Sequence, residues 1–162
     1  MRKDYVDSCV FLGFALDQNQ NCKDYLFTVG YKNRNIGIIS HFVLSEILCT
    51  ILTKIKHSDD TIKEEDLRES AIKMSIKTIR NLKEEGKLII KKLSTHIIDE
   101  TLLKELNAID NRLTEDDILH IIEAIKNQCD FFVTADKEIT ENQKLKEYLS
   151  HYPNLKTMKI DL

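Results

Sequence analysis

The chain has 162 residues, of which 42% are hydrophobic and 31% are charged, with a single proline and four glycines. This composition excludes a collagen-like, linker-rich or disordered chain, and the length suits one domain, residues 1–162, with a sizeable buried core. The formal net charge of −3 excludes a general electrostatic attraction to nucleic acid or to anionic membranes. It does not exclude an enzyme that acts on nucleic acid, because lysine clusters such as 87–92 can contact phosphates locally.

No apolar run approaches the length of about 18 residues that indicates a membrane-spanning helix, and the first residues lack the pattern of a signal peptide. The four cysteines include no pair at C-x-x-C spacing, so a structural zinc site is not expected. We therefore expect a cytoplasmic protein with reduced thiols.

Short apolar runs alternate with longer segments of helical pattern along the whole chain. The first half is expected to form a strand at 5–12, a helix at 22–32, a strand at 35–40, a buried helix at 41–55 and an amphipathic helix within 61–86. The second half is expected to form a strand at 87–93, helices at 94–109 and 113–128, a strand at 129–137, a short helix at 141–152 and a strand at 155–162. Thr61 is a suitable cap for the amphipathic helix and Gly86 a suitable end.

This alternation predicts an α/β fold with a central, mainly parallel sheet that helices cover on both faces. In sheets of this kind, ligands bind beyond the carboxyl ends of the strands. Polar side chains at those ends are therefore the first candidates for a functional site.

Three carboxylates stand where the fold would bring them to one edge of the sheet. Asp7 interrupts the first apolar run, Asp136 follows the run FFVT by two residues, and Glu46 lies within the apolar helix at 41–55. A carboxylate in such surroundings is costly to bury unless it is paired or binds a cation. Each also has a plainer explanation: a strand-end or turn position for Asp7 and Asp136, and the solvent face of its helix for Glu46.

A fourth candidate lies at the start of the helix at 113–128, where three acids follow one another. Thr114 and Asp117 form a capping-box pattern, so helix capping alone could explain the acids. Helical phase nevertheless separates them. Asp116 shares a stripe with His120 that we expect to face water, whereas Asp117 lies at the edge of the buried face. Asp117 is therefore the acid that is placed to reach a site.

Four carboxylates that converge repel one another and take up protons unless a cation compensates their charge. Oxygen ligands suit Mg²⁺ or Mn²⁺, which are therefore the expected cofactors. The predicted site consists of Asp7, Glu46, Asp117 and Asp136.

The segments that contain these four acids, taken in chain order, resemble the motifs of the PIN (PilT N-terminal) domain family. The resemblance is greatest to its stand-alone VapC-type toxin ribonucleases. YVDSCVFL (5–12) resembles the family's opening motif, apolar–Asp–Thr/Ser–x–apolar, and GIISHFVLSEIL (37–48) resembles the second. LTEDDILHIIEAI (113–125) resembles Leu-x-x-x-Asp-x-x-x-x-x-x-Ala, and CDFFVTADKEI (129–139) resembles the closing strand with its Thr-x-Asp. The residues that match are Asp7, Ser8, Glu46, Leu113, Asp117, Ala124, Thr134 and Asp136.

The resemblance implies a metal-dependent endoribonuclease that hydrolyses RNA phosphodiester bonds with one or two Mg²⁺ or Mn²⁺ ions. Ser8 and Thr134 would orient a carboxylate or a phosphate oxygen from just outside the metal site. The catalytic and metal-binding residues that it implies are Asp7, Glu46, Asp117 and Asp136.

The resemblance also implies two partners, an RNA substrate and a small antitoxin protein. A homodimer is a further expectation, because dimers are the commonest oligomers. The helical segment at about 56–110 is longer than in the shortest toxins, and its long helix could bind a partner or simply pack on the domain. The alternative function is a non-catalytic PIN-fold module that binds RNA or protein. A phosphatase with an aspartyl nucleophile is disfavoured, because Asp4 and Asp7 are not spaced as Asp-x-Asp.

Overall fold

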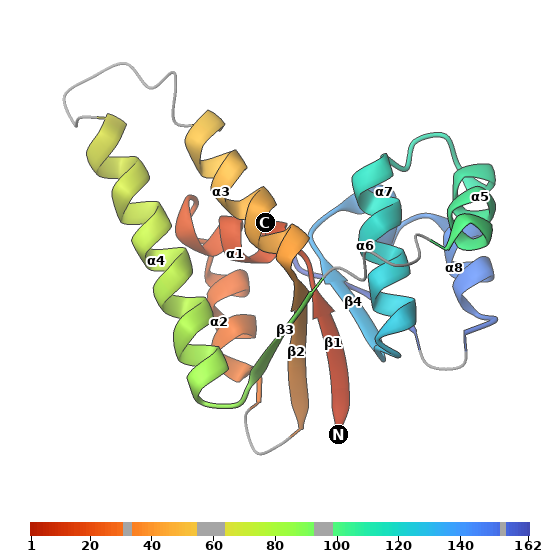
Figure 1. Cartoon of the computed structure of the whole chain (residues 1–162), viewed down its shortest axis with the longest axis horizontal. Coiled ribbons are helices and arrows are strands. Elements are labelled where there is room, and N and C mark those ends of the chain that lie inside the picture. Colours follow the sequence, from red (N-terminus) through yellow and green to blue (C-terminus); the bar gives the residue numbers. More distant parts are fainter. Residues whose placement is uncertain (31–33, 55–63, 93–98, 153–154) are drawn as a thin grey trace.

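The structure is a computed structural model that describes residues 1–30, 34–54, 64–92, 99–152 and 155–162. Five parallel strands form one sheet in the order β3-β2-β1-β4-β5 (Figure 1). The strands are β1 (Arg2–Val6), β2 (Asn35–Ser40), β3 (Leu88–Lys91), β4 (Phe131–Thr134) and β5 (Lys156–Lys159). Every pairing is parallel because each strand is connected to the next through helices.

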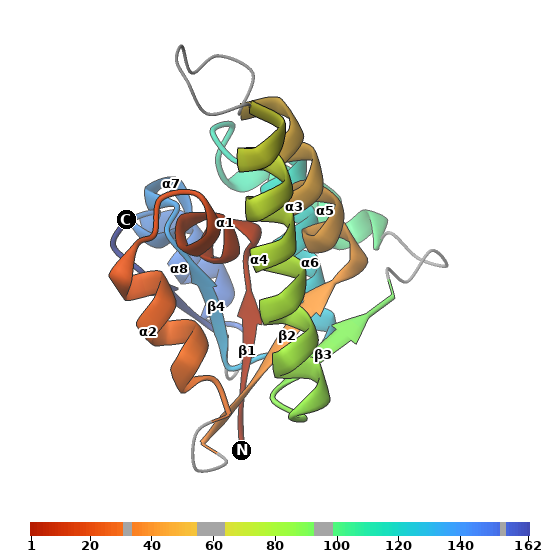
Figure 2. The ribbon, with the colours of Figure 1, turned by 90° about the vertical axis from the view of Figure 1, so that its left-hand side faces the viewer.

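Helices cover both faces of this sheet, and buried apolar side chains form a continuous core between the layers. One layer, which Figure 2 views from outside, consists of α1 (Ser8–Ala15), α2 (Gln20–Thr28), α3 (His41–Lys54) and α4 (Glu64–Glu84). The other consists of α5 (Glu100–Ile109), α6 (Glu115–Lys126) and α8 (Gln143–Leu149), while the short helix α7 (Lys137–Thr140) follows β4. This arrangement confirms the α/β fold class predicted from the alternation of strands and helices.

The central strand β1 determines where a ligand site can form. Its residue Tyr5 is fully buried and pairs with Ile38 of β2 on one side and with Phe132 of β4 on the other. The chain leaves β1 towards β2 and returns much later to β4 on the opposite side. Such a reversal of strand order opens a crevice beyond the carboxyl ends of the strands. Asp7, the first residue after β1, lies at this point.

The sequence predicted one strand at residues 5–12, but the structure divides this segment between a strand and a helix. Strand β1 ends at Val6, the Asp7 carboxylate accepts a hydrogen bond from the backbone N–H of Ser8, and helix α1 begins there. A short run of apolar residues has no clear period, so it does not distinguish a strand from a buried helix. The N-cap at Asp7 marks the boundary, and it places this carboxylate at a strand–helix junction rather than inside a strand.

The other element ends agree more closely with the predictions. Gly86, with a φ of +69°, follows the end of α4 as expected of a residue that adopts the left-handed region. The helix predicted at 94–109 is described from its cap at Asp99 onward. Residues 93–98 and the predicted cap Thr61 lie outside the described residues.

Candidate metal centre

Asp7 is held in one orientation by a set of short hydrogen bonds. Its Oδ1 accepts from the backbone N–H of Ser8 at 2.6 Å and from the Ser8 hydroxyl at 3.4 Å. Its Oδ2 accepts from the Thr134 hydroxyl at 2.6 Å and from the Cys9 thiol at 3.2 Å. The side chain is nearly buried, with 8% of the residue exposed. The two residues that the sequence assigned to an orienting role, Ser8 and Thr134, both contact this carboxylate.

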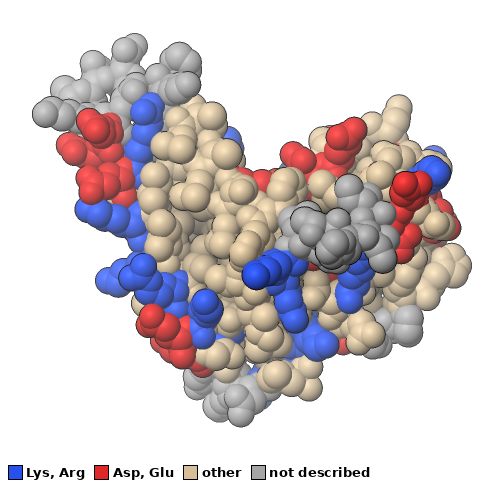
Figure 3. Space-filling view, in the orientation of Figure 1, with Lys and Arg blue, Asp and Glu red and all other residues tan. Residues whose placement is uncertain are grey.

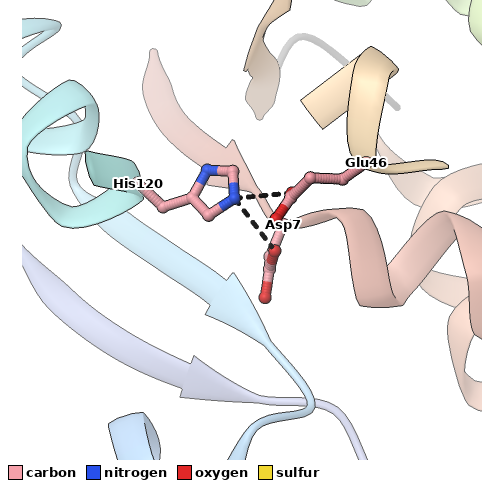
Figure 4. Close-up of side chains that lie close together, drawn as sticks. All are labelled: Asp7, Glu46 and His120. Atoms are coloured by element: carbon pink, nitrogen blue, oxygen red, sulfur yellow. Dashed lines mark hydrogen bonds and ion pairs between the residues drawn. The ribbon is translucent and has the colours of Figure 1, made fainter. Parts of the chain in front are cut away.

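Glu46 and His120 approach Asp7 from two different helices, α3 and α6 (Figure 4). The Nε2 atom of His120 lies 2.6 Å from Oε2 of Glu46 and 4.0 Å from Oδ1 of Asp7. One ligand atom from each of the three side chains lies within 4.8 Å of the other two. In the described part of the chain, this is the group of three that is arranged closely enough to share a metal ion.

The prediction that His120 faces water is wrong, because only 3% of this residue is exposed. Asp116 lies on the same helical stripe and is exposed as expected, so the prediction holds for one residue of the stripe and fails for the other. The stripe runs from the open first turn of α6 into its covered middle, where Phe42 of α3 packs on the imidazole with ring centroids 4.9 Å apart. The apolar neighbours Ile118 and Ile121 were the signal in the sequence that could have indicated burial.

The second nitrogen of His120 is also engaged. Its Nδ1 lies 2.9 Å from the hydroxyl of Tyr5, which in turn lies 3.1 Å from the hydroxyl of Ser40. Burial raises the pKa of Tyr5 well above its usual range, so this phenol keeps its proton and can both donate and accept. The imidazole is therefore fixed at both ends, between a carboxylate and a buried hydroxyl pair.

The carboxylates around His120 determine its charge. Burial by itself lowers the pKa of this imidazole, but the hydrogen bond to Glu46 and the negative charges of Asp7, Glu46 and Asp117 outweigh it. The pKa of His120 is raised as a result. A positive charge is thus favoured at the centre of this carboxylate group, which is the property that a cation site requires.

Asp117 caps its helix and also belongs to this electrostatic cluster. Its Oδ2 accepts from the backbone N–H of Thr114 at 2.8 Å and from the Thr114 hydroxyl at 2.7 Å, which completes a capping box. Burial raises the pKa of Asp117, the bonds from Thr114 oppose that rise, and the negative charges of Asp136 and Asp7 add to it. Capping and proximity to the site are therefore compatible at this position.

Asp136 is connected to the cluster through the backbone. Its side chain accepts from the N–H of Glu138 at 2.6 Å and caps α7, a helix that the sequence did not predict. Its own N–H donates to the Thr134 hydroxyl at 3.0 Å, and that hydroxyl donates to Asp7. Asp117 and Asp136 thus lie close enough to interact electrostatically but outside the tight group of Asp7, Glu46 and His120.

The spacing of the donor atoms fits a divalent ion. Two ligands on one Mg²⁺ or Mn²⁺ ion stand roughly 3 to 4.3 Å apart, given bonds of about 2.1 Å. The 4.0 Å between His120 Nε2 and Asp7 Oδ1 falls in this range, whereas the hydrogen-bonded pair of His120 and Glu46, at 2.6 Å, has to separate slightly. Carboxylate oxygens and an imidazole nitrogen are both common metal ligands.

Figure 3 shows a depression between the α3–α4 side and the α5–α6 side of the molecule, with acidic side chains along its edge. Two further pockets lie elsewhere in the described structure. One of about 400 Å³ lies beside α8 and β5, and one of about 340 Å³ lies between α3, α4 and β3. Neither is lined by Asp7, Glu46, His120, Asp117 or Asp136.

Comparison with known proteins identifies the fold. No protein-family model matches this chain, and no curated protein matches it significantly in sequence. A chain of the solved VapBC2 complex from Rickettsia felis, bound to a DNA fragment from its promoter, superposes with a TM-score of 0.59 at 16% sequence identity. The match covers 98% of this chain and 99% of that chain. The PIN-like fold expected from the sequence motifs is confirmed, and at this identity the likeness concerns the fold. No described helix is long and apolar enough to cross a membrane.

Proposed function

We propose that this protein is a divalent-metal-dependent endoribonuclease and the toxin of a toxin–antitoxin pair. One observation carries the proposal: Asp7, directly after the central strand, shares a group of potential metal ligands with Glu46 and His120, beside the carboxylates of Asp117 and Asp136. That position is where an α/β sheet of this topology binds its ligand. The chain of VapBC2, which has the same fold, supports the toxin assignment.

The side chains would divide the work of the site between binding and orientation. Asp7 offers fixed carboxylate oxygens, because Ser8 and Thr134 restrict its rotation. Glu46 and His120 bring ligand atoms from helices on opposite sides of Asp7. A bound Mg²⁺ or Mn²⁺ ion supplies Lewis acidity and offsets the negative charge that develops on the phosphodiester.

Asp117 and Asp136 add negative charge at the same edge of the sheet. Without a cation, these carboxylates would repel the phosphates of RNA. A cation held among them would remove that repulsion. Binding of RNA at this site should therefore depend on metal as strongly as cleavage does.

Incubation of the protein with total RNA and with tRNA, with and without Mn²⁺, tests the proposed activity. We expect cleavage by the wild-type protein with Mn²⁺ only, and none by the Asp7→Asn variant under the same conditions. Asp116→Asn is the matched control, because Asp116 is exposed on the same helix turn as Asp117 and should leave cleavage intact. Equal cleavage by wild type and Asp7→Asn would refute the assignment. Metal-dependent binding of RNA without any cleavage would favour the non-catalytic module.

The proposed antitoxin partner has a suitable surface on the α3–α4 layer. The pocket of about 340 Å³ there is lined by Leu44, Ile47, Leu48, Ser75, Ile76, Ile79, Arg80, Lys83 and Ile90. The lining is mainly apolar and includes the cations Arg80 and Lys83, and Ile76 is 43% exposed. An amphipathic helix with apolar residues on one face and acids beside them would complement this surface.

Co-expression with a short neighbouring open reading frame tests the partner. We expect a stable complex that loses ribonuclease activity and that Ile76→Asp weakens by at least tenfold. Size-exclusion chromatography with light scattering distinguishes the two partners that could occupy the pocket, an antitoxin or a second copy of the chain. A homodimer of the chain alone that Ile76→Asp dissociates would assign the pocket to self-association instead.

A further inference from the structure

We infer that His120 is itself a metal ligand, so that the site is a mixed nitrogen–oxygen centre that prefers Mn²⁺ to Mg²⁺. The inference rests on the proposed metal-dependent function and deepens it by assigning metal selectivity to one side chain. The four acids predicted from the sequence form an oxygen-only set, and His120 was expected to lie in water. The tertiary structure instead places its imidazole between Asp7 and Glu46.

The Nε2 atom of His120 lies close enough to Asp7 and Glu46 to bind the same ion as they do. This atom lies 4.0 Å from Asp7 Oδ1 and 2.6 Å from Glu46 Oε2, so a single ion placed among the three could contact all of them after a small movement. The residue is 3% exposed, and Phe42 covers its ring. The imidazole therefore has little freedom to turn towards solvent and leave the group.

The partners of Nδ1 suit a metal-bound imidazole. A ligating histidine usually donates its second ring N–H to a fixed acceptor, which sets the tautomer and the ring orientation. Here the Tyr5 hydroxyl lies 2.9 Å from Nδ1, and Ser40 lies 3.1 Å beyond it. With Nε2 as the ligand, the proton between His120 and Glu46 would be released to solvent, while Nδ1–H would donate to Tyr5 and Tyr5 to Ser40. Because the phenol can donate or accept, the same buried pair also serves the metal-free tautomer.

A nitrogen ligand changes which ion the site prefers. Mg²⁺ favours oxygen ligands and gives up its water reluctantly. Imidazole is a better ligand for first-row transition metals, and Mn²⁺, the first member of their affinity order, is the one transition metal of the two expected ions. A site of Asp7, Glu46 and His120 should therefore bind Mn²⁺ more tightly than Mg²⁺, and the preference should depend on the imidazole rather than on the carboxylates.

A plainer role competes with this one, in which His120 only holds Glu46 in place by a hydrogen bond. The substitution His120→Gln separates the two roles, because a glutamine amide can still donate to Glu46 but is a poor substitute for a nitrogen ligand. His151→Gln is the matched control, since His151 is exposed and bonds to the Tyr148 carbonyl far from the site.

The experiment is titration of the RNA-free protein with Mn²⁺ and with Mg²⁺, read by calorimetry. We expect wild type and His151→Gln to bind Mn²⁺ at least about tenfold more tightly than Mg²⁺. In His120→Gln, Mn²⁺ affinity should fall by about 10- to 100-fold, as for loss of a metal-site contact, while Mg²⁺ affinity changes little. An unchanged preference in a folded His120→Gln protein would refute the ligand role and leave the proposed ribonuclease standing. Absence of binding of either ion to the wild type would refute the proposed function itself.

A second readout needs no variant and so does not depend on folding. Pulsed electron paramagnetic resonance of Mn²⁺ bound to the wild-type protein detects a directly bound imidazole through its nitrogen coupling. We expect that coupling in the wild-type protein. A bound Mn²⁺ ion without nitrogen coupling would show that His120 positions Glu46 and does not bind the ion.

Discussion

Two buried aspartates, Asp4 within strand β1 and Asp7 directly after it, differ in the partners that hold them. Asp4 is fully buried, and its Oδ2 accepts from Arg2 at 2.7 Å, Tyr25 at 2.9 Å and Asn35 at 3.0 Å. Asp7, three residues later, is nearly as buried but accepts from hydroxyls, a thiol and a backbone N–H.

The partners explain what each residue does. The guanidinium of Arg2 compensates the charge of Asp4 permanently, so this acid ties the amino-terminal end of the sheet together. Asp7 instead has a neutral hydrogen-bond shell and the imidazole of His120 at 4.0 Å. Hydrogen bonds fix the orientation of the Asp7 carboxylate, but no guanidinium neutralises its charge. This combination suits a site that receives a cation. Burial alone therefore does not distinguish the two acids; their hydrogen-bond partners do.

The largest expected effect is on catalysis, from Asp7→Asn. The amide keeps the shape and most hydrogen bonds but loses the charge that a divalent ion requires. RNA cleavage with Mn²⁺ should fall roughly a thousandfold, which corresponds to about 4 kcal/mol of transition-state stabilisation. Thermal unfolding of the metal-free protein should change little, and circular dichroism serves as the control for folding. A large drop in the melting temperature would place Asp7 with Asp4 among the structural acids.

Asp4→Ala should act on stability alone. Removal of the carboxylate leaves Arg2 and Asn35 without their buried acceptor, and we expect a loss of about 3 kcal/mol in the free energy of unfolding. In a chain of this length that loss lowers the melting temperature by roughly 10 °C. Cleavage per folded molecule, measured well below the transition, should match wild type. A loss of activity without loss of stability would contradict the contrast between the two acids.

Thr134→Val should have an intermediate effect on the site. This buried hydroxyl donates to Asp7 at 2.6 Å and accepts from the N–H of Asp136 at 3.0 Å, so it aligns one acid and links it to another. Affinity for Mn²⁺ in a calorimetric titration should fall by about 10- to 100-fold, the usual cost of losing such a contact. Thr134→Ser restores the hydroxyl and should recover most of the affinity. Failure of serine to rescue binding would indicate a packing role.

The smallest expected effect is a gain in stability from Asp117→Asn. Burial and the charges of Asp136 and Asp7 raise the pKa of Asp117 in the folded protein, so the folded state binds this proton more tightly than the unfolded state does. Protonation of Asp117 therefore stabilises the folded protein. This contribution is fully present below the ordinary Asp pKa of about 3.9 and is lost as pH rises through the pKa of Asp117 in the folded state. At pH 7 the metal-free Asp117→Asn protein should therefore melt slightly higher than wild type, and the difference should disappear as pH falls below the ordinary Asp pKa.

Asp116→Asn is the control for that comparison and should change neither the melting temperature nor RNA cleavage. Asp117→Asn should, in contrast, lower cleavage with Mn²⁺ by at least tenfold despite its higher melting temperature. The reverse pattern for these neighbours would mean that the helical phase of α6 does not select the acid that serves the site.

The sequence by itself determined the α/β class and the placement of most helices, because these depend on local periodicity and on capping residues. Gly86 at the end of α4 and the Thr114–Asp117 capping box of α6 are local features that can be identified without knowing the fold. Asp7, Glu46, Asp117 and Asp136 were candidates for the same reason: their positions in the predicted elements put them near one edge of a parallel sheet. Their proposed catalytic roles remain for the experiments above.

Only the tertiary structure decided which side chains meet. The sequence pattern did not predict the end of β1 at Val6, because a buried strand and a short buried helix have the same apolar composition. The burial of His120 was hidden because it depends on α3, more than sixty residues earlier in the chain, which brings Phe42 and Glu46 over α6. Helical phase describes one helix against one surface. It does not include a second helix that covers the stripe, and that contact turns a histidine expected in water into a candidate metal ligand.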